Sequence, residues 1–332
     1  MTVDEAYDFC RRITHKHGAN FSVGFRFLPN VKRRAVYAAY AYCRFADDIA
    51  DEEDFDVDAL ASAIPTGVIP RVSAEFPADK RRPSASAGDP ALTRGMTQRA
   101  LDDTTALRMS RLDAWQRELD AAYAGTPTHP ITIALADALQ HFAIPKSAFV
   151  ALIDGCRQDM TKTRYETFAE LLQYCDYVAT SISDISLSIF GYRTDKALEY
   201  GRNLSTALQL TNVTRDVGDD VSRDRIYIPR EELRRFNVSE RELLERAEND
   251  RVRALIEFQI ARAERYFREA EPLLGELAFD ARFPTLLMGG VYATVLAKLR
   301  KDPLAAVRER LSLSTLQKLL VVGTRVLRPH FV

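Results

Sequence analysis

The stretch VKRRAVYAAYAYCRFADDIADEED, residues 31–54, decides the fold class. It contains no Gly or Pro, follows Pro29, and repeats its apolar residues at helical spacing, which predicts a helix over 31–54. A polar line runs along this helix, since steps of 4, 3 and 4 separate Tyr40, Arg44, Asp47 and Asp51, with Asp48 beside them. Such steps place these side chains on one helical face.

Helical patterns continue through the rest of the chain. They predict helices over 94–124, 131–142, 146–162, 168–190, 194–221, 239–274 and 284–300, and RDRIYIP (223–229) predicts an extended strap. Five prolines between 65 and 90 predict an irregular surface segment at about 62–93, which we do not interpret as a domain boundary. We therefore expect a single all-α domain over residues 1–332, built as a helical bundle.

The charge balance excludes one function class. Lys and Arg total 46 against 47 Asp and Glu, so the chain lacks the excess of cations that a general nucleic-acid binder needs. The start has no basic region followed by an apolar one, which favours a cytoplasmic protein. Four cysteines without a CxxC pair are expected to be buried thiols.

A second polar line follows in QLTNVTRDVGDD, residues 209–220. Gln209, Asn212, Asp216 and Asp220 lie at steps of 3, 4 and 4, with Arg215 and Asp219 beside them. Carboxylates at i and i+4 repel each other at about 6 Å unless a cation neutralises them, and oxygen ligands with room for water suit Mg²⁺. Both lines could instead be solvated faces. Amides, alanines and aromatics beside the acids favour an internal diphosphate site, because a solvated face mixes Lys and Glu.

The ordered motifs resemble the squalene and phytoene synthase family, which joins two prenyl diphosphates head to head. The resemblance rests on FRFLP (25–29), YAYCRFADDIADE (40–52), DMTKTRYETFAELLQYC (159–175), QLTNVTRDVGDD, RDRIYIP and VYATVLAKLR (291–300). It implies an all-helical isoprenoid-synthase fold with a central cavity. It also implies Mg²⁺ ions between the aspartates and two prenyl diphosphates.

The resemblance assigns roles to individual residues. Asp47, Asp48 and Asp51 match its first aspartate motif, and Asp216 and Asp220 match the second. It implies that Asp47, Asp51, Asn212, Asp216 and Asp220 bind metal, and that Tyr40, Arg44, Asp48, Gln209, Asn212 and Arg215 bind substrate. Tyr165 in KTRY and Tyr227 in RIYIP match tyrosines near the reacting carbons. Their alternatives are a core aromatic for Tyr165 and a surface residue for Tyr227.

Different motifs favour different substrates. The tracts 20–23 (NFSV) and 157–165 resemble farnesyl-using bacterial members, whereas 215–218 (RDVG) resembles phytoene synthase. We expect two farnesyl diphosphates to give presqualene diphosphate and then squalene or hydroxysqualene. The alternative is a phytoene synthase that uses two geranylgeranyl diphosphates. NADPH would be needed only if squalene is the product.

Two rival hypotheses come from other classes: a head-to-tail or cyclising terpene enzyme, which should lack KTRY and RIYIP, and a noncatalytic helical protein that binds metal or a partner. For the family member we expect contact with the inner face of the membrane, because prenyl products are apolar, and downstream terpenoid enzymes as further partners.

Overall fold

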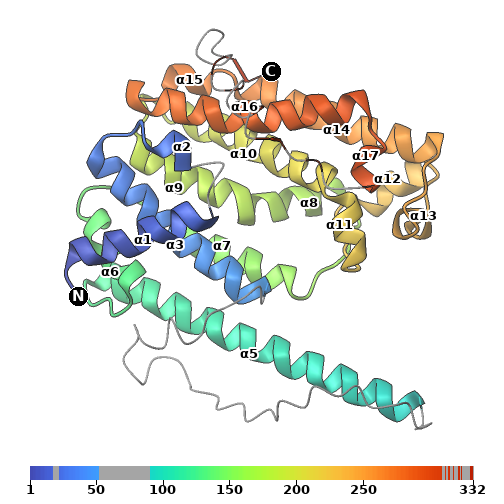
Figure 1. Cartoon of the computed structure of the whole chain (residues 1–332), viewed down its shortest axis with the longest axis horizontal. Coiled ribbons are helices and arrows are strands. Elements are labelled where there is room, and N and C mark those ends of the chain that lie inside the picture. Colours follow the sequence, from blue (N-terminus) through green and yellow to red (C-terminus); the bar gives the residue numbers. More distant parts are fainter. Residues whose placement is uncertain are drawn as a thin grey trace.

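The computed structural model describes residues 1–17, 22–51 and 90–308, together with single residues between 311 and 331. In this part every regular element is a helix, and the β-structure consists of two isolated bridges (Figure 1). The all-α prediction is confirmed. The helices are α1 (Val3–His17), α2 (Ser22–Phe25), α3 (Asn30–Asp51), α5 (Pro90–Ala124), α6 (Pro130–Leu139), α7 (Lys146–Asp159), α8 (Phe168–Cys175), α9 (Ser181–Phe190), α10 (Lys196–Arg215), α11 (Val217–Ser222), α12 (Arg230–Arg235), α13 (Glu240–Leu244), α14 (Asp250–Ala270), α15 (Leu273–Glu276), α16 (Phe279–Lys301) and α17 (Ala305–Arg308).

Helices α3 and α10 each pack against several other helices. Helix α3 contacts α1, α5, α6, α7 and α9, and α10 contacts α8, α9, α14 and α16. In Figure 1, α14 and α16 lie on one side of α8 and α9, and α3 and α7 lie on the other. The two helices that carry the polar lines therefore belong to one bundle.

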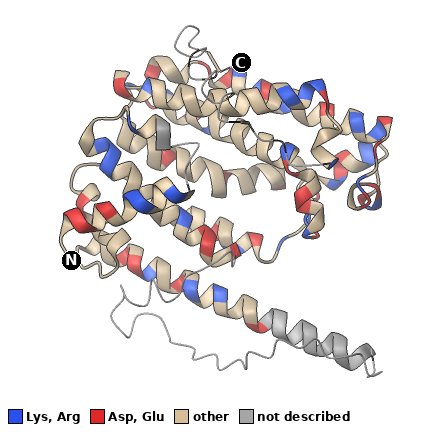
Figure 2. Ribbon diagram, in the orientation of Figure 1, with Lys and Arg blue, Asp and Glu red and all other residues tan. Residues whose placement is uncertain are grey.

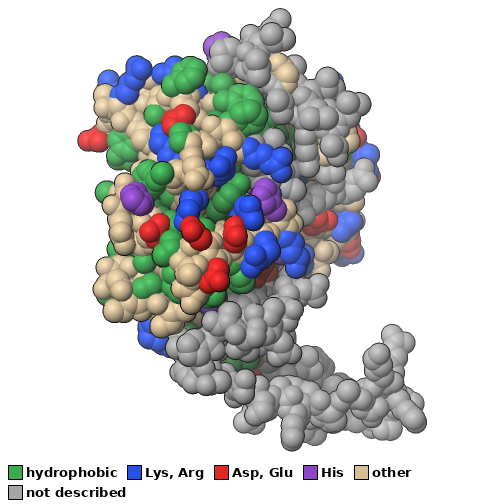
Figure 3. All heavy atoms as spheres, turned by 60° about the vertical axis from the view of Figure 1, so that its left-hand side comes forward, with side chains coloured by type: hydrophobic (Ala, Val, Ile, Leu, Met, Phe, Trp, Pro, Cys, Tyr) green, Lys and Arg blue, Asp and Glu red, His purple; other side chains and the backbone are tan. Residues whose placement is uncertain are grey.

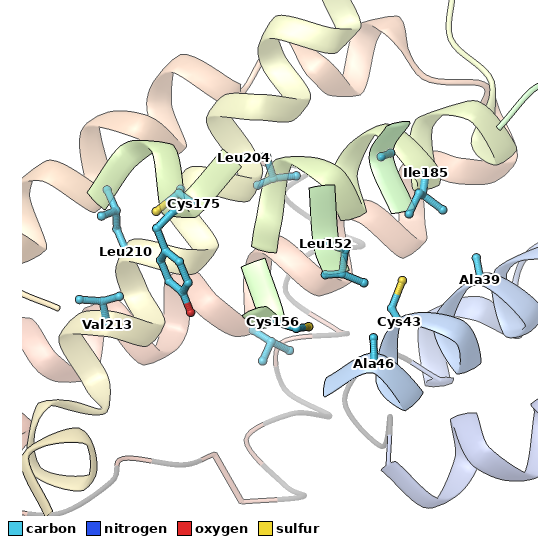
Figure 4. Packing of buried hydrophobic residues seen from close by; sticks show 14 of the residues in the cluster. Ala39, Cys43, Ala46, Leu152, Cys156, Cys175, Ile185, Leu204, Leu210 and Val213 are labelled. Atoms are coloured by element: carbon cyan, nitrogen blue, oxygen red, sulfur yellow. The ribbon is translucent and has the colours of Figure 1, made fainter. Parts of the chain in front are cut away.

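Small side chains allow α3 to pack closely on its neighbours. Ala39, Cys43 and Ala46 are buried in α3, and Figure 4 shows them near Leu152 and Cys156 of α7. All four cysteines of the chain are buried free thiols, as predicted. Among the described residues no helix has both the length and the apolarity that crossing a membrane requires.

Several boundaries differ from the prediction. The helix expected over 194–221 is interrupted at Asp216, whose φ of −99° and ψ of 10° leave the helical region, although its N–H still donates to the Asn212 carbonyl. The helix expected over 239–274 divides into α13 and α14, because Arg246 adopts a φ of 54° and Asn249 caps a new start. Between Phe168 and Phe190 a π-helical turn spans Asp176–Thr180.

The Pro-rich segment was predicted at about 62–93, and residues 52–89 lie outside the part of the chain that the structure describes. Its last residues, 90–93, form the first turn of α5, which begins at Pro90 and not at Arg94. Proline is favoured at the first position of a helix, where its missing N–H has no partner to lose. The single-domain organisation stays a prediction.

Candidate active site

The first polar line lies on one face of the uninterrupted helix α3. Arg44 forms an ion pair with Asp48 at 2.5 Å, and its Nε is buried without a hydrogen-bond partner among the described residues. Asp47 accepts a weak hydrogen bond from the Cys156 thiol at 3.5 Å. Burial raises the pKa of Asp47 to about 7, with Arg44 lowering it and Asp51 raising it. Asp47 thus lies in a site that favours a compensating cation.

His17, the last residue of α1, belongs to the same neighbourhood although the sequence did not identify it. Burial and the charge of Arg44 lower the pKa of His17, and Asp48 opposes them. Tyr40, one turn before Arg44, is partly buried, and burial raises its pKa to about 12. These interactions place an imidazole with a lowered pKa and a phenol with a raised pKa near the Arg44–Asp48 pair.

The second polar line continues through the interruption between α10 and α11. Arg215 binds Asp216 with two hydrogen bonds, from Nε at 2.7 Å and from Nη2 at 2.5 Å. Asn212 donates to Gln209 at 3.3 Å, while its own Oδ1 is buried without a partner in the described part of the chain. Burial, followed by repulsion from Asp216, raises the pKa of Asp220 to about 7.

The local backbone of α11 depends on Gly218. A Cβ built there would lie 2.7 Å from the carbonyl oxygen of Val307 in α17, closer than a real Cβ contact. Arg246 also donates to the Gly218 carbonyl at 2.7 Å. The glycine therefore allows α11 to approach α17 and sets the position of Asp219 and Asp220. In Figure 2, the ribbon is coloured red for acidic residues at the end of α3 and on α11.

Two residues that the sequence did not single out connect the acidic lines, Asp159 and Arg225. Arg225, in the strap, donates to the Asp159 carbonyl at 3.1 Å. Its charge lowers the pKa of Asp220, and it interacts electrostatically with Asp51. Burial raises the pKa of Asp159 to about 6, despite hydrogen bonds from Tyr174 at 2.9 Å and Tyr227 at 3.1 Å. One cation thus lies within electrostatic range of both acidic lines.

Three tyrosine rings form a cluster next to Asp159. Tyr165 stacks on Tyr227 with centroids 5.7 Å apart, and Tyr174 lies 5.6 Å from Tyr165 and 5.3 Å from Tyr227. Gln158 donates to the Tyr165 hydroxyl at 3.1 Å. The structure brings together the two predicted tyrosines and adds Tyr174. Both this tyrosine and Asp159 lie inside the motif DMTKTRYETFAELLQYC, which is the signal that could have identified them.

Backbone hydrogen bonds explain why KTRY and RIYIP occur together. The Ile226 amide donates to the Thr163 carbonyl at 3.0 Å, and the Arg230 amide donates to the Tyr165 carbonyl at 2.9 Å. A parallel bridge joins Arg164 to Ile226. The strap predicted at 223–229 is thereby held against the segment that follows α7, which positions Arg225 and Tyr227.

The donor set fits Mg²⁺. Burial raises the pKa values of Asp47 and Asp220, so a bound cation would offset the cost of holding these carboxylates charged, and the buried Asn212 Oδ1 adds an uncharged oxygen. Within the described residues no three His, Cys, Asp or Glu side chains form a ready-made metal cluster. Mg²⁺ does not need one, because it is usually bound by one or two carboxylates, waters and substrate phosphates. The assignment of Asp47, Asp51, Asn212, Asp216 and Asp220 as ligands stays a prediction.

Comparisons with known proteins point to one family. The family profile described as squalene/phytoene synthase matches residues 14–317. The 15-cis-phytoene synthase of Synechocystis sp. is 32% identical over 98% of this chain and 86% of its own, and that of Synechococcus elongatus is 30% identical over 98% and 94%.

Solved structures share the fold. The squalene synthase HpnC of Alicyclobacillus acidocaldarius superposes with a TM-score of 0.71 at 28% identity, covering 90% of this chain and 95% of that one. A dehydrosqualene synthase in complex with a ligand gives a TM-score of 0.76 at 23% identity, covering 99% and 98%. The bundle is therefore the isoprenoid-synthase fold.

Proposed function

Because this chain belongs to the squalene/phytoene synthase family and is a prenyltransferase of that type, we propose that it condenses two geranylgeranyl diphosphates head to head into phytoene. The observation that carries the substrate choice is the similarity to phytoene synthases along nearly the whole chain. The noncatalytic alternative loses its support, because the family assignment makes the chain a prenyltransferase.

The farnesyl substrate expected from the sequence is less well supported than its alternative. The side chains of the tract 20–23, which favoured it, lie outside the described part of the chain and do not bear on the choice. In the tract 157–165, Arg157 is paired with Asp113 at 2.6 Å and Asp154 at 2.7 Å, which ties α7 to α5. The same tract contributes Asp159 and Tyr165 to the candidate site, and Arg215, in the motif that favoured phytoene synthase, lies there too. The choice of substrate therefore rests on the similarity to phytoene synthases.

The site residues supply the binding and orientation that the reaction needs. Arg44, Arg215 and Arg225 present guanidinium groups, which bind phosphate oxygens through paired hydrogen bonds. Developing negative charge on the leaving diphosphate is stabilised by such fixed cations, and this lowers the barrier to ionisation. Bound Mg²⁺, which the family typically uses, would neutralise the same charge on the acidic side of the site.

The first ionisation leaves an allylic carbocation. The double bond of the second substrate attacks it, a proton leaves, and a cyclopropylcarbinyl diphosphate forms. Loss of the second diphosphate and a second proton then gives the linear product. The faces of Tyr165, Tyr174 and Tyr227 favour a nearby cation, and an apolar bundle excludes the water that would trap it. The hydrogen bonds to Asp159 hold two of these rings in place.

Product identification tests the proposal. The purified protein is incubated with Mg²⁺ and either geranylgeranyl or farnesyl diphosphate, with and without NADPH. We expect phytoene from geranylgeranyl diphosphate without reductant. Squalene or hydroxysqualene from farnesyl diphosphate, with no conversion of the longer substrate, would show that the first expectation was right and this proposal wrong.

The same proposal includes a cellular setting. A phytoene synthase has an apolar product that does not travel freely in water, so we place this enzyme in the cytoplasm, in peripheral contact with the inner face of the membrane. Enzymes that act later on the terpenoid chain are its expected partners.

A further inference from the structure

Several large hydrophobic side chains are exposed on the described surface, and some of them gather at one end of the molecule. The exposed ones among the described residues are Met1, Val3, Phe27, Val31, Tyr192, Leu198, Leu244 and Phe279. Phe279 is 88% exposed, Phe27 56% and Val31 52%. Exposed apolar residues scattered singly need no explanation, whereas a contiguous group marks a site of interaction.

Packing at this end brings three segments together. Phe27, before α3, meets Phe283 of α16 edge to face with centroids 4.7 Å apart, and Phe279 lies one helical turn before Phe283. Lys32 joins the starts of both helices through an ion pair with Asp280 at 2.8 Å. A bridge between Tyr192 and Leu277 adds the turn after α9. We call Phe27, Val31, Tyr192, Phe279 and Phe283 the apolar tip.

A cationic pocket adjoins the apolar tip. A cavity of about 500 Å³ between α1 and α3 is lined by Asp4, Tyr7, Asp8, Arg11, His15, Arg26, Asn30, Arg33, Arg34 and Tyr37. Arg11 pairs with Asp8 at 3.0 Å, and Arg34 pairs with Asp4 at 2.7 Å. Arg33 donates to two neutral acceptors, the Arg26 carbonyl and Asn30 Oδ1. Since four arginines face two aspartates, the pocket carries net positive charge.

We propose that the apolar tip inserts into the interface of an anionic phospholipid bilayer while the cationic pocket binds lipid phosphate groups. Apolar insertion combined with attraction between Arg or Lys and anionic headgroups is the usual basis of peripheral membrane binding. Figure 3 turns this side of the molecule forward and shows hydrophobic side chains beside a mixed group of cationic and acidic ones. The inference assigns a surface to the membrane contact in the proposed function, but it does not depend on the substrate.

The position of the apolar tip suits the candidate active site. Helix α3 begins at the apolar tip and carries Asp47 near its other end, about 24 Å away at 1.5 Å per residue. Docking at the apolar tip would leave the acidic end, which takes charged diphosphates, on the aqueous side. The apolar chains of substrate and product would then lie between the acidic end and the lipid.

Vesicle binding of the full chain tests the inference without any substrate. The probes are vesicles of phosphatidylcholine alone and of phosphatidylcholine mixed with phosphatidylglycerol. We expect at least tenfold stronger binding to the anionic vesicles, weakened by salt. The double variant Phe27→Ser/Phe279→Ser should bind at least tenfold more weakly, and Arg26→Gln/Arg33→Gln several-fold more weakly.

Matched controls lie at the opposite end of the molecule. Leu244→Ser, at a 43% exposed position, and the double variant Arg234→Gln/Arg241→Gln should bind like the wild type. Equal losses in controls and tip variants, or no preference for anionic vesicles, would overturn the inference, as would a dimer in solution that Phe279→Ser disrupts. Vesicle binding by a protein that converts no prenyl diphosphate would leave this inference standing and refute the proposed function.

Discussion

The two acidic lines have the same arrangement of charges on different backbones, the first on a continuous helix and the second across a helix interruption. In α3, Arg44 forms its ion pair with Asp48, and its charge also lowers the pKa of Asp47. At the α10–α11 interruption, Arg215 pairs with Asp216, and the charges of Arg225 and Arg223 lower the pKa of Asp220. Burial nevertheless raises the pKa of Asp47 and of Asp220 to about 7. Each line thus has one carboxylate held by an arginine and one available to a bound cation, although only the first lies on a continuous helix.

The largest effect should come from removing one carboxylate in either line. Asp47→Asn or Asp216→Asn should lower turnover by a hundredfold or more while the fold survives, because each change removes a carboxylate that the site needs. Asp47→Asn also relieves like-charge repulsion with Asp51, whereas Asp216→Asn breaks the pair with Arg215. Product formation and far-UV circular dichroism provide the two measurements. Asp120→Asn, at a surface position paired with Lys146, is the matched control. Near-normal turnover in both site variants would sink the assignment.

A smaller loss should follow when the link between the two lines is changed. Arg225→Gln should lower kcat/KM by about ten- to a hundredfold, because a fixed cation within range of Asp51 and Asp220 is lost. Arg225→Lys keeps the charge but not the planar guanidinium, so it should recover part of the loss. Equal activity of wild type and Arg225→Gln would show that the lines act without this link.

The second line differs from the first in that its backbone packs closely against another helix, at Gly218 of α11. Gly218→Ala should reduce the free energy of unfolding by about 1–3 kcal/mol, because its Cβ would meet the Val307 carbonyl. Gly275→Ala is the control, since nothing lies within 4 Å of a Cβ at that position. Denaturant unfolding measures both. A neutral Gly218→Ala would mean that α17 moves aside easily.

The two lines also show which structural features can be predicted from sequence periodicity. A period of 3.6 predicted the face of α3 that carries Tyr40, Arg44 and Asp47, because no residue interrupts that helix. It gave the residues of the second line but not the interruption at Asp216, which accompanies the bidentate pair with Arg215 and the approach of α11 to α17. The interruption and the approach of α11 to α17 depend on contacts between distant segments, which the spacing of residues along the chain does not predict.

The same limit applies to Asp159 and Arg225. Each stands alone in its own segment, without a partner at helical spacing, and the two meet only because the strap pairs with the residues after α7. Tyr165 and Tyr227 were predicted through the resemblance, but their stacking on each other and on Tyr174 required the folded chain. Family motifs thus identified residues, and the structure supplied their partners.

The smallest expected effect is a pH dependence of stability in the metal-free protein. The folded pKa values of Asp47 and Asp220, about 7, exceed their ordinary value of 3.8, so the folded state holds these protons more tightly than the unfolded state. This contribution to stability is therefore present at low pH and is lost as the pH rises through about 7. With EDTA present, the Tm should fall by about 3–5 °C between about pH 5.5 and pH 7.5 because of these groups. Asp47→Asn/Asp220→Asn should flatten that slope and Asp120→Asn should keep it, whereas an unchanged slope in the double variant would place the titrating groups elsewhere.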